Sequence, residues 1–177
     1  MNPDYRVEAI VILLNEDCIL QGYFPLIPYR HDIVRNLREM GCRRKSDCMN
    51  LSEKSLLDIG LPDAEMAGLF RRFLTMYDIK PAKLKEIDAV CQTPEEASSF
   101  RELYHLPGVK STRAALYYKA GFRSLEMLAR SSVEQIVAKT ESVIEAENLN
   151  LKVPLMKEIR THIAVARAFT DCFDTAE

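Results

Sequence analysis

Apolar residues recur at spacings of three and four along most of this chain, with polar residues between them. Such spacing gathers apolar side chains on one face of an α-helix, whereas a strand would require strict alternation, which no long segment shows. The sequence therefore predicts an all-α protein. The predicted helices cover residues 4–19, 29–40, 52–59, 62–77, 82–90, 94–105, 111–120, 124–130, 132–147 and 154–171.

Local signals support several of these helix boundaries. Thr93, Pro94 and Glu96 combine an N-cap, a first-turn proline and a capping-box acid. Three predicted helices end at a glycine, which suits the left-handed conformation that closes many helices. The glycines are Gly41, Gly60 and Gly121, and we expect the apolar residues that follow (Cys42, Leu61, Phe122) to fold back on Leu37, Leu56 and Tyr117.

The two halves of the chain share the same order of features. A shift of 80 residues aligns Leu26 with Leu106, Gly41 with Gly121 and Ser52 with Ser132. This predicts two related helical domains, residues 1–80 and 81–177, joined near Asp78–Lys83. The second copy has an extra segment, Glu141–Lys152. The alternative is that unrelated helical segments share glycine endings by chance.

The segment LPGVKSTRAALYYKAGFRSLEMLA, residues 106–129, resembles the helix-hairpin-helix element. More broadly, residues 94–171 are similar to an uncharacterised bacterial and archaeal family of helix-hairpin-helix domains, and the first half resembles the sterile-alpha-motif type of five-helix domain. The resemblance implies two tandem helix-hairpin-helix or sterile-alpha-motif-like domains. The positions that match the hairpin element are Leu106, Pro107, Gly108, Val109, Ala114 and Gly121.

The resemblance also implies a site that contacts the phosphate backbone of nucleic acid. A helix N-terminus offers unpaired N–H groups and partial positive charge to a phosphate. Lys110 replaces the second glycine of the element, and the first copy, LIPYR, has no glycine at all. The alternative is a purely structural corner between two helices. The candidate nucleic-acid-binding residues are Gly108, Val109, Lys110, Ser111, Thr112 and Arg113.

The charge distribution is uneven although the net charge is only −2. Residues 30–45 and 101–130 each contain six Lys or Arg and two acids, a net +4 apiece, so the rest of the chain carries −10. Two basic segments on an acidic protein are consistent with weak, salt-dependent binding of a polyanion. Alternatively, these cations complement the negative ends of helices.

Other classes of function lack their usual signals. No nucleophile elbow, phosphate-binding loop, zinc-protease motif or dinucleotide glycine pattern is present. In helix-hairpin-helix glycosylases a catalytic lysine and acid would fall at Thr112 and near Arg130, and neither fits. Three scattered histidines argue against zinc, so we expect no enzyme activity, cofactor or metal.

The chain also lacks an apolar stretch of about 20 residues that could span a bilayer. Five scattered cysteines without a C-x-x-C pair predict free thiols and a cytoplasmic protein. The sequence thus predicts a non-enzymatic binding protein. The leading hypothesis for its function is non-sequence-specific binding of the nucleic-acid backbone. The alternative is a protein-interaction or self-association module in which the hairpin is only structural.

Overall fold

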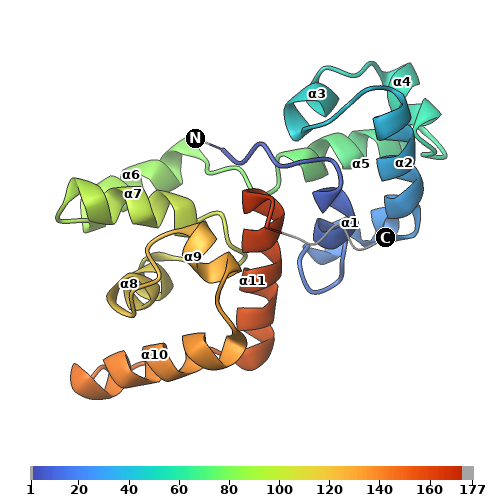
Figure 1. Cartoon of the computed structure of the whole chain (residues 1–177). Coiled ribbons are helices and arrows are strands. Elements are labelled where there is room, and N and C mark those ends of the chain that lie inside the picture. The colour runs from blue at the N-terminus through green and yellow to red at the C-terminus, as the bar shows by residue number, and fades with distance from the viewer. Residues whose placement is uncertain (1, 173–177) are drawn as a thin grey trace.

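The computed structural model describes residues 2–172, and every regular element in that range is helical, which confirms the predicted all-α class (Figure 1). None of these helices is both long and apolar enough to cross a membrane. The elements are α1 (Ala9–Leu13), a 3₁₀ helix η1 (Gln21–Tyr29), α2 (Arg30–Glu39), α3 (Lys45–Met49), α4 (Glu53–Asp58), α5 (Ala64–Leu74), α6 (Pro81–Val90), α7 (Pro94–Leu103), α8 (Ser111–Lys119), α9 (Leu125–Ala129), α10 (Val133–Ala146) and α11 (Met156–Thr170).

The prediction of one helix over residues 4–19 is wrong, because only Ala9–Leu13 is helical. The backbone of residues 5–7 pairs with residues 43–45 instead. The Val7 N–H donates to the Arg43 carbonyl and the Lys45 N–H donates to the Tyr5 carbonyl, both at 2.9 Å. These bonds hold the start of the chain extended and compete with helix formation.

Two short helices were not predicted. η1 contains Pro25 and Pro28, which lack the N–H that an α-helix would use, so this segment adopts the tighter 3₁₀ form. α3 is only five residues long, too short for apolar periodicity to reveal it.

The predicted glycine endings are confirmed. Gly41, Gly60 and Gly121 all have positive φ. At the end of α8, the Phe122 N–H donates to the Tyr117 carbonyl at 2.8 Å and the Gly121 N–H to the Tyr118 carbonyl at 3.0 Å. The Phe122 ring then lies 6.3 Å from the Tyr117 ring, as the fold-back contact requires.

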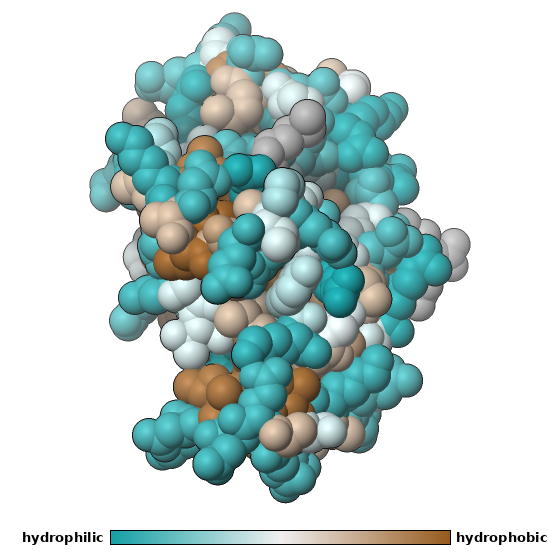
Figure 2. Space-filling view, turned by 90° about the vertical axis from the view of Figure 1, so that its left-hand side faces the viewer, coloured by the Kyte–Doolittle hydropathy of each residue, from teal (hydrophilic) through white to brown (hydrophobic). Residues whose placement is uncertain are grey.

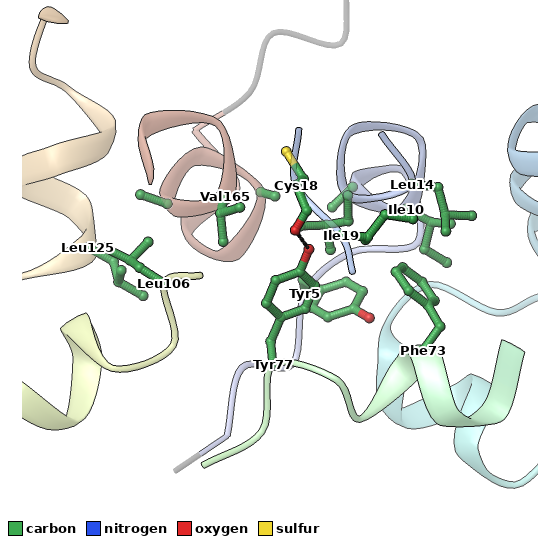
Figure 3. Close-up of a cluster of buried hydrophobic side chains, with 14 of the residues drawn as sticks. Tyr5, Ile10, Leu14, Cys18, Ile19, Phe73, Tyr77, Leu106, Leu125 and Val165 are labelled. Carbon is green, nitrogen blue, oxygen red and sulfur yellow. Dashed lines mark hydrogen bonds between the residues drawn. The ribbon is translucent and has the colours of Figure 1, made fainter. Parts of the chain in front are cut away.

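Helix α11 lies between α1–α5 and α6–α10 and packs mainly against α9 and α1 (Figure 1). Near its end, the Phe169 ring contacts Tyr5 at 5.6 Å and Tyr77 at 5.1 Å between ring centroids. Buried side chains from both halves form one continuous cluster, in which Leu106 and Val165 accompany Tyr5 and Tyr77 (Figure 3).

The proposed division into domains 1–80 and 81–177 stays a prediction. Residue 1 and residues 173–177 of these predicted domains lie outside the described residues. The continuous core means that, if the halves are related copies, they fold against one another through α11.

Candidate phosphate-binding corner

The turn between α7 and α8 is held in place by its apolar residues. Leu106 and Val109 are almost completely buried, whereas Gly108 between them is exposed. Gly108 has φ +73°, a conformation that side chains other than glycine rarely adopt. A Cβ added there would meet no atom within 4 Å. The glycine therefore serves the turn geometry, and its exposed backbone leaves room for a ligand.

Helix α8 begins directly after this turn and has no side-chain cap. Its N-cap, Lys110, is extended and exposed. The first intrahelical bond runs from the Ala114 N–H to the Lys110 carbonyl at 2.9 Å. The amides of residues 111–113 precede this donor and have no acceptor within the helix. Thr112 is exposed and Ser111 is half-buried. The N-terminus of α8 thus presents N–H groups and partial positive charge toward solvent.

Arg113 is not free to contact a phosphate, as the sequence predicts it to be, because it pairs with an acid of the same chain. Its guanidinium makes a two-point contact with Glu158 of α11, with Nε–Oε1 at 2.9 Å and Nη2–Oε2 at 3.2 Å. Planar two-point pairing of this kind is geometrically specific. Arg113 therefore ties the start of α8 to α11, which leaves Lys110 as the cation at the turn.

A second connection to α11 uses His162, which is only 1% exposed. Its Nε2 lies 2.9 Å from the Pro107 carbonyl oxygen, and its Nδ1 lies 2.7 Å from the Tyr117 hydroxyl. Because a carbonyl can only accept, Nε2 carries the proton. Burial lowers the pKa of His162 below its usual 6.5, so the ring is neutral and Nδ1 accepts from Tyr117. This buried chain fixes the hairpin carbonyl that precedes Gly108.

A signal for His162 is present in the sequence, although the sequence-based prediction did not use it. With Ile159, Ile163 and Ala166, it occupies one apolar face of the terminal helix, where a polar ring needs a buried partner. Spacing alone could not identify that partner, because Pro107 lies 55 residues away.

The basic segment 101–130 is largely neutralised by acids. Within residues 2–172, Lys110 is the one cation of the six that makes no ion pair. Four of the acids that pair with it come from the rest of the chain and offset its predicted excess of positive charge, and the fifth, Glu126, lies within the segment. The pairs are Arg101–Asp88 (2.6 Å), Arg113–Glu158, Lys119–Glu147, Arg123–Glu95 (2.9 Å) and Arg130–Glu126 (2.7 Å).

A cavity of about 250 Å³ lies beside the turn. Pro107 and Gly108 line one side, and residues 17–20 line another, with Lys83 also contributing. Asp17 and Asp78 line it too, but each is paired with a lysine, Lys157 at 3.0 Å and Lys45 at 2.5 Å. The fold thus brings Lys83, which the sequence did not single out, near the candidate turn.

No group of three or more His, Cys, Asp or Glu side chains within the described range could hold a metal ion. The five cysteines are free thiols, and burial raises the pKa of Cys18 to about 11 and that of Cys48 to about 12.

Comparison with known proteins finds one similarity that includes the corner. No solved structure matches the chain. Residues 98–169, which include α8 to α10, the turn and almost all of α11, match a family model described as a domain of unknown function, DUF4332. This similarity lies entirely in the second half of the chain.

Proposed function

We propose that this protein is a non-enzymatic binding protein whose helix-hairpin-helix turn contacts the phosphate backbone of nucleic acid without reading its sequence. One observation carries the proposal. An exposed left-handed Gly108, the uncapped start of α8 and the unpaired Lys110 lie at a single corner. Each of these features favours an anion, and a phosphate could meet all three together.

The six candidate residues then have different roles. Gly108, Lys110 and Thr112 are exposed and would contact phosphate through a backbone amide, an ammonium group and a hydroxyl. Val109 and Arg113 support the turn, through burial and through Glu158 respectively. Ser111, half-buried, contributes the first amide of α8.

The paired charges around the corner limit the strength of binding. Exposed ion pairs contribute only about 0–1 kcal/mol each and can exchange partners, but their acids remain and repel a polyanion. Few phosphate charges are therefore neutralised. The logarithm of the affinity should fall with the logarithm of salt concentration by about 0.7–0.9 per phosphate contacted.

The test is a fluorescence-anisotropy titration with labelled single- and double-stranded DNA and RNA at about 50 and 200 mM salt. Lys110→Glu removes the unpaired cation, and Thr112→Glu places an acid among the amides of α8. An acid in the first turn favours the helix, so Thr112→Glu should fold normally while repelling phosphate. Both variants should bind at least about tenfold more weakly at low salt.

The matched control is Lys54→Glu, which makes the same charge change as Lys110→Glu at an exposed position of α4. It should bind like the original protein. Binding that is unaffected by Lys110→Glu and Thr112→Glu, or absent at low salt, would overturn the proposal and leave the turn as a structural corner.

A protein-interaction or self-association module remains the second candidate, because large apolar side chains are exposed near the same corner. Leu20 is 67% exposed at the rim of the cavity, and Leu155, just before α11, is 73% exposed. The Lys157–Asp17 ion pair joins these two segments. On the face in Figure 2, by contrast, apolar areas are small and separated by hydrophilic side chains.

Sedimentation of the protein at increasing concentration tests self-association through this surface. The second candidate predicts an oligomer that Leu20→Ser and Leu155→Ser convert to a monomer. A monomer at all concentrations would remove self-association from consideration.

A further inference from the structure

A second basic surface lies in the first half of the chain, away from the hairpin. A groove of about 440 Å³ runs beside α2 and α1. Val11 and Val34 contribute apolar surface, and Arg35, Arg38 and Arg43 contribute positive charge. The side chains of Arg35 and Arg38 are 62% and 60% exposed, so the groove is open to solvent.

The sequence of α2 explains why these arginines face outward. Ile33 and Leu37 are fully buried and Val34 nearly so, which orients the helix on the core. Arg35 and Arg38, three residues apart, therefore lie close together on the exposed side. The glycine ending at Gly41 then turns the chain and brings Arg43 back beside the helix.

Each guanidinium has a contact that orients it. Arg35 uses Nη2 to contact Asp32 at 2.7 Å, and Arg38 uses Nε to contact Glu8 at 3.4 Å. Arg43 uses Nη1 to donate to the carbonyls of residues 38 and 42, at 3.0 and 3.3 Å. A guanidinium has five N–H donors in a planar fork. All three are thus pre-oriented, and the exposed side chains of Arg35 and Arg38 can offer donors to a ligand.

The lining of the groove offers guanidinium groups to an anion. Three arginines line it against one acid, Glu39, and His31. Asp32 and Glu8 pair with Arg35 and Arg38 and offset their charge, so the attraction for a phosphate is local to the guanidinium groups and is not a net charge of the groove. Arginine binds phosphate well because its fork matches two phosphate oxygens. An open groove of spaced forks fits an extended chain of phosphates better than an enclosed small molecule.

We propose that this groove is a second contact for the phosphate backbone of the same nucleic acid that meets the hairpin. The proposal rests on the proposed function and extends it, because it gives the first half of the chain a role although its own turn lacks the hairpin glycines. Arg35, Arg38 and Arg43 would bind the phosphates. Val11 and Val34 would lie beneath the nucleic-acid strand.

The test variant is Arg35→Gln with Arg38→Gln, which removes two charges but keeps polar, helix-compatible side chains. The control is Arg72→Gln with Arg130→Gln, which removes the same charge from exposed positions outside both sites. Binding of a labelled single-stranded oligonucleotide is measured by anisotropy at several salt concentrations. In the groove variant, the slope of log affinity against log salt concentration should become less steep by about 0.7 for each phosphate that is no longer neutralised, or about 1.4 for two. The control should change this slope little.

The outcomes separate this inference from the proposed function. If Lys110→Glu weakens binding and the groove variant does not, the groove is overturned and the hairpin stands. If the groove variant weakens binding and Lys110→Glu does not, the hairpin function is overturned and the groove stands. An equal loss of affinity in the control pair would show a general effect of net charge and overturn the groove. No binding to any oligonucleotide would overturn both.

Discussion

The connection between His162 and the hairpin makes a quantitative prediction. Replacing His162 with Phe keeps a ring of similar size but removes both hydrogen bonds, leaving the Pro107 carbonyl and the Tyr117 hydroxyl without partners. A buried polar group left unsatisfied costs about 1–3 kcal/mol. The Pro107 carbonyl lies nearer solvent than the Tyr117 hydroxyl, so we expect about 1 kcal/mol from the first and about 2 from the second.

The total decrease in unfolding free energy, about 3 kcal/mol, is measurable by urea unfolding. With an m-value of about 2 kcal/mol/M, the midpoint should fall by about 1.5 M. Tyr117→Phe should lower the unfolding free energy by less, because it leaves only Nδ1 of His162 without a partner. The two substitutions combined should cost less than their sum, since they break one shared bond.

The same histidine predicts a dependence on pH. Burial lowers the pKa of His162 in the folded state, so the unfolded chain binds a proton first as pH falls through about 6.5. In the original protein, the contribution of neutral His162 to the unfolding free energy is therefore fully present above this pH. Below it, stability declines by up to about 1.4 kcal/mol per pH unit until the lowered folded pKa is reached.

In His162→Phe this contribution is absent. The difference in stability between the two proteins should therefore shrink from pH 7.5 to pH 5. A difference that stays constant, or a midpoint change under about 0.3 M, would refute the assignment of His162 as a neutral, doubly bonded anchor.

Three further predictions follow from other interactions. Gly108→Ala should lower the unfolding free energy by about 1–2 kcal/mol, because φ +73° strains an alanine although no atom obstructs it; an unchanged urea midpoint would contradict this. Lys45→Met should lower the unfolding free energy by about 2 kcal/mol, because it leaves the mostly buried Asp78 carboxylate without its partner. Adding Asp78→Leu should restore most of that stability. Thermal unfolding of both variants tests this, and a double variant no more stable than Lys45→Met would count against it. At pH 8, iodoacetamide should modify Cys172 well before Cys18 and Cys48, because burial raises the pKa of those two thiols to about 11 and about 12. Peptide mass spectrometry at successive times tests this order. Earlier modification of Cys18 or Cys48 would contradict it.

Local chemistry allowed much of the helical framework to be predicted. The glycine stops, the Thr93 cap and the long apolar stripes depend on neighbours within a few residues, and the structure confirms them. The start of the chain could not be predicted in this way. Its extended form depends on hydrogen bonds to residues 43–45, about 40 positions away, which no local pattern encodes.

The candidate corner was predictable in position but not in chemistry. The Pro-Gly pair predicted a turn before the helix that begins near Ser111, and the positive φ of Gly108 and the start of α8 at Ser111 confirm that turn. The pairing of Arg113 with Glu158 and the anchoring of Pro107 by His162 each span at least 45 residues. Counting charges along the sequence could not show that acids distant in the chain would neutralise the basic segment.

The most direct test of the phosphate-binding corner follows backbone amides during a titration with a short single-stranded oligonucleotide, using two-dimensional ¹H–¹⁵N NMR at about 50 mM salt. The account predicts that the amides of residues 108–113 shift progressively and saturate, and that Lys110→Glu abolishes these shifts. Shifts confined to other surfaces, with residues 108–113 unmoved, would contradict it and identify the turn as a structural corner.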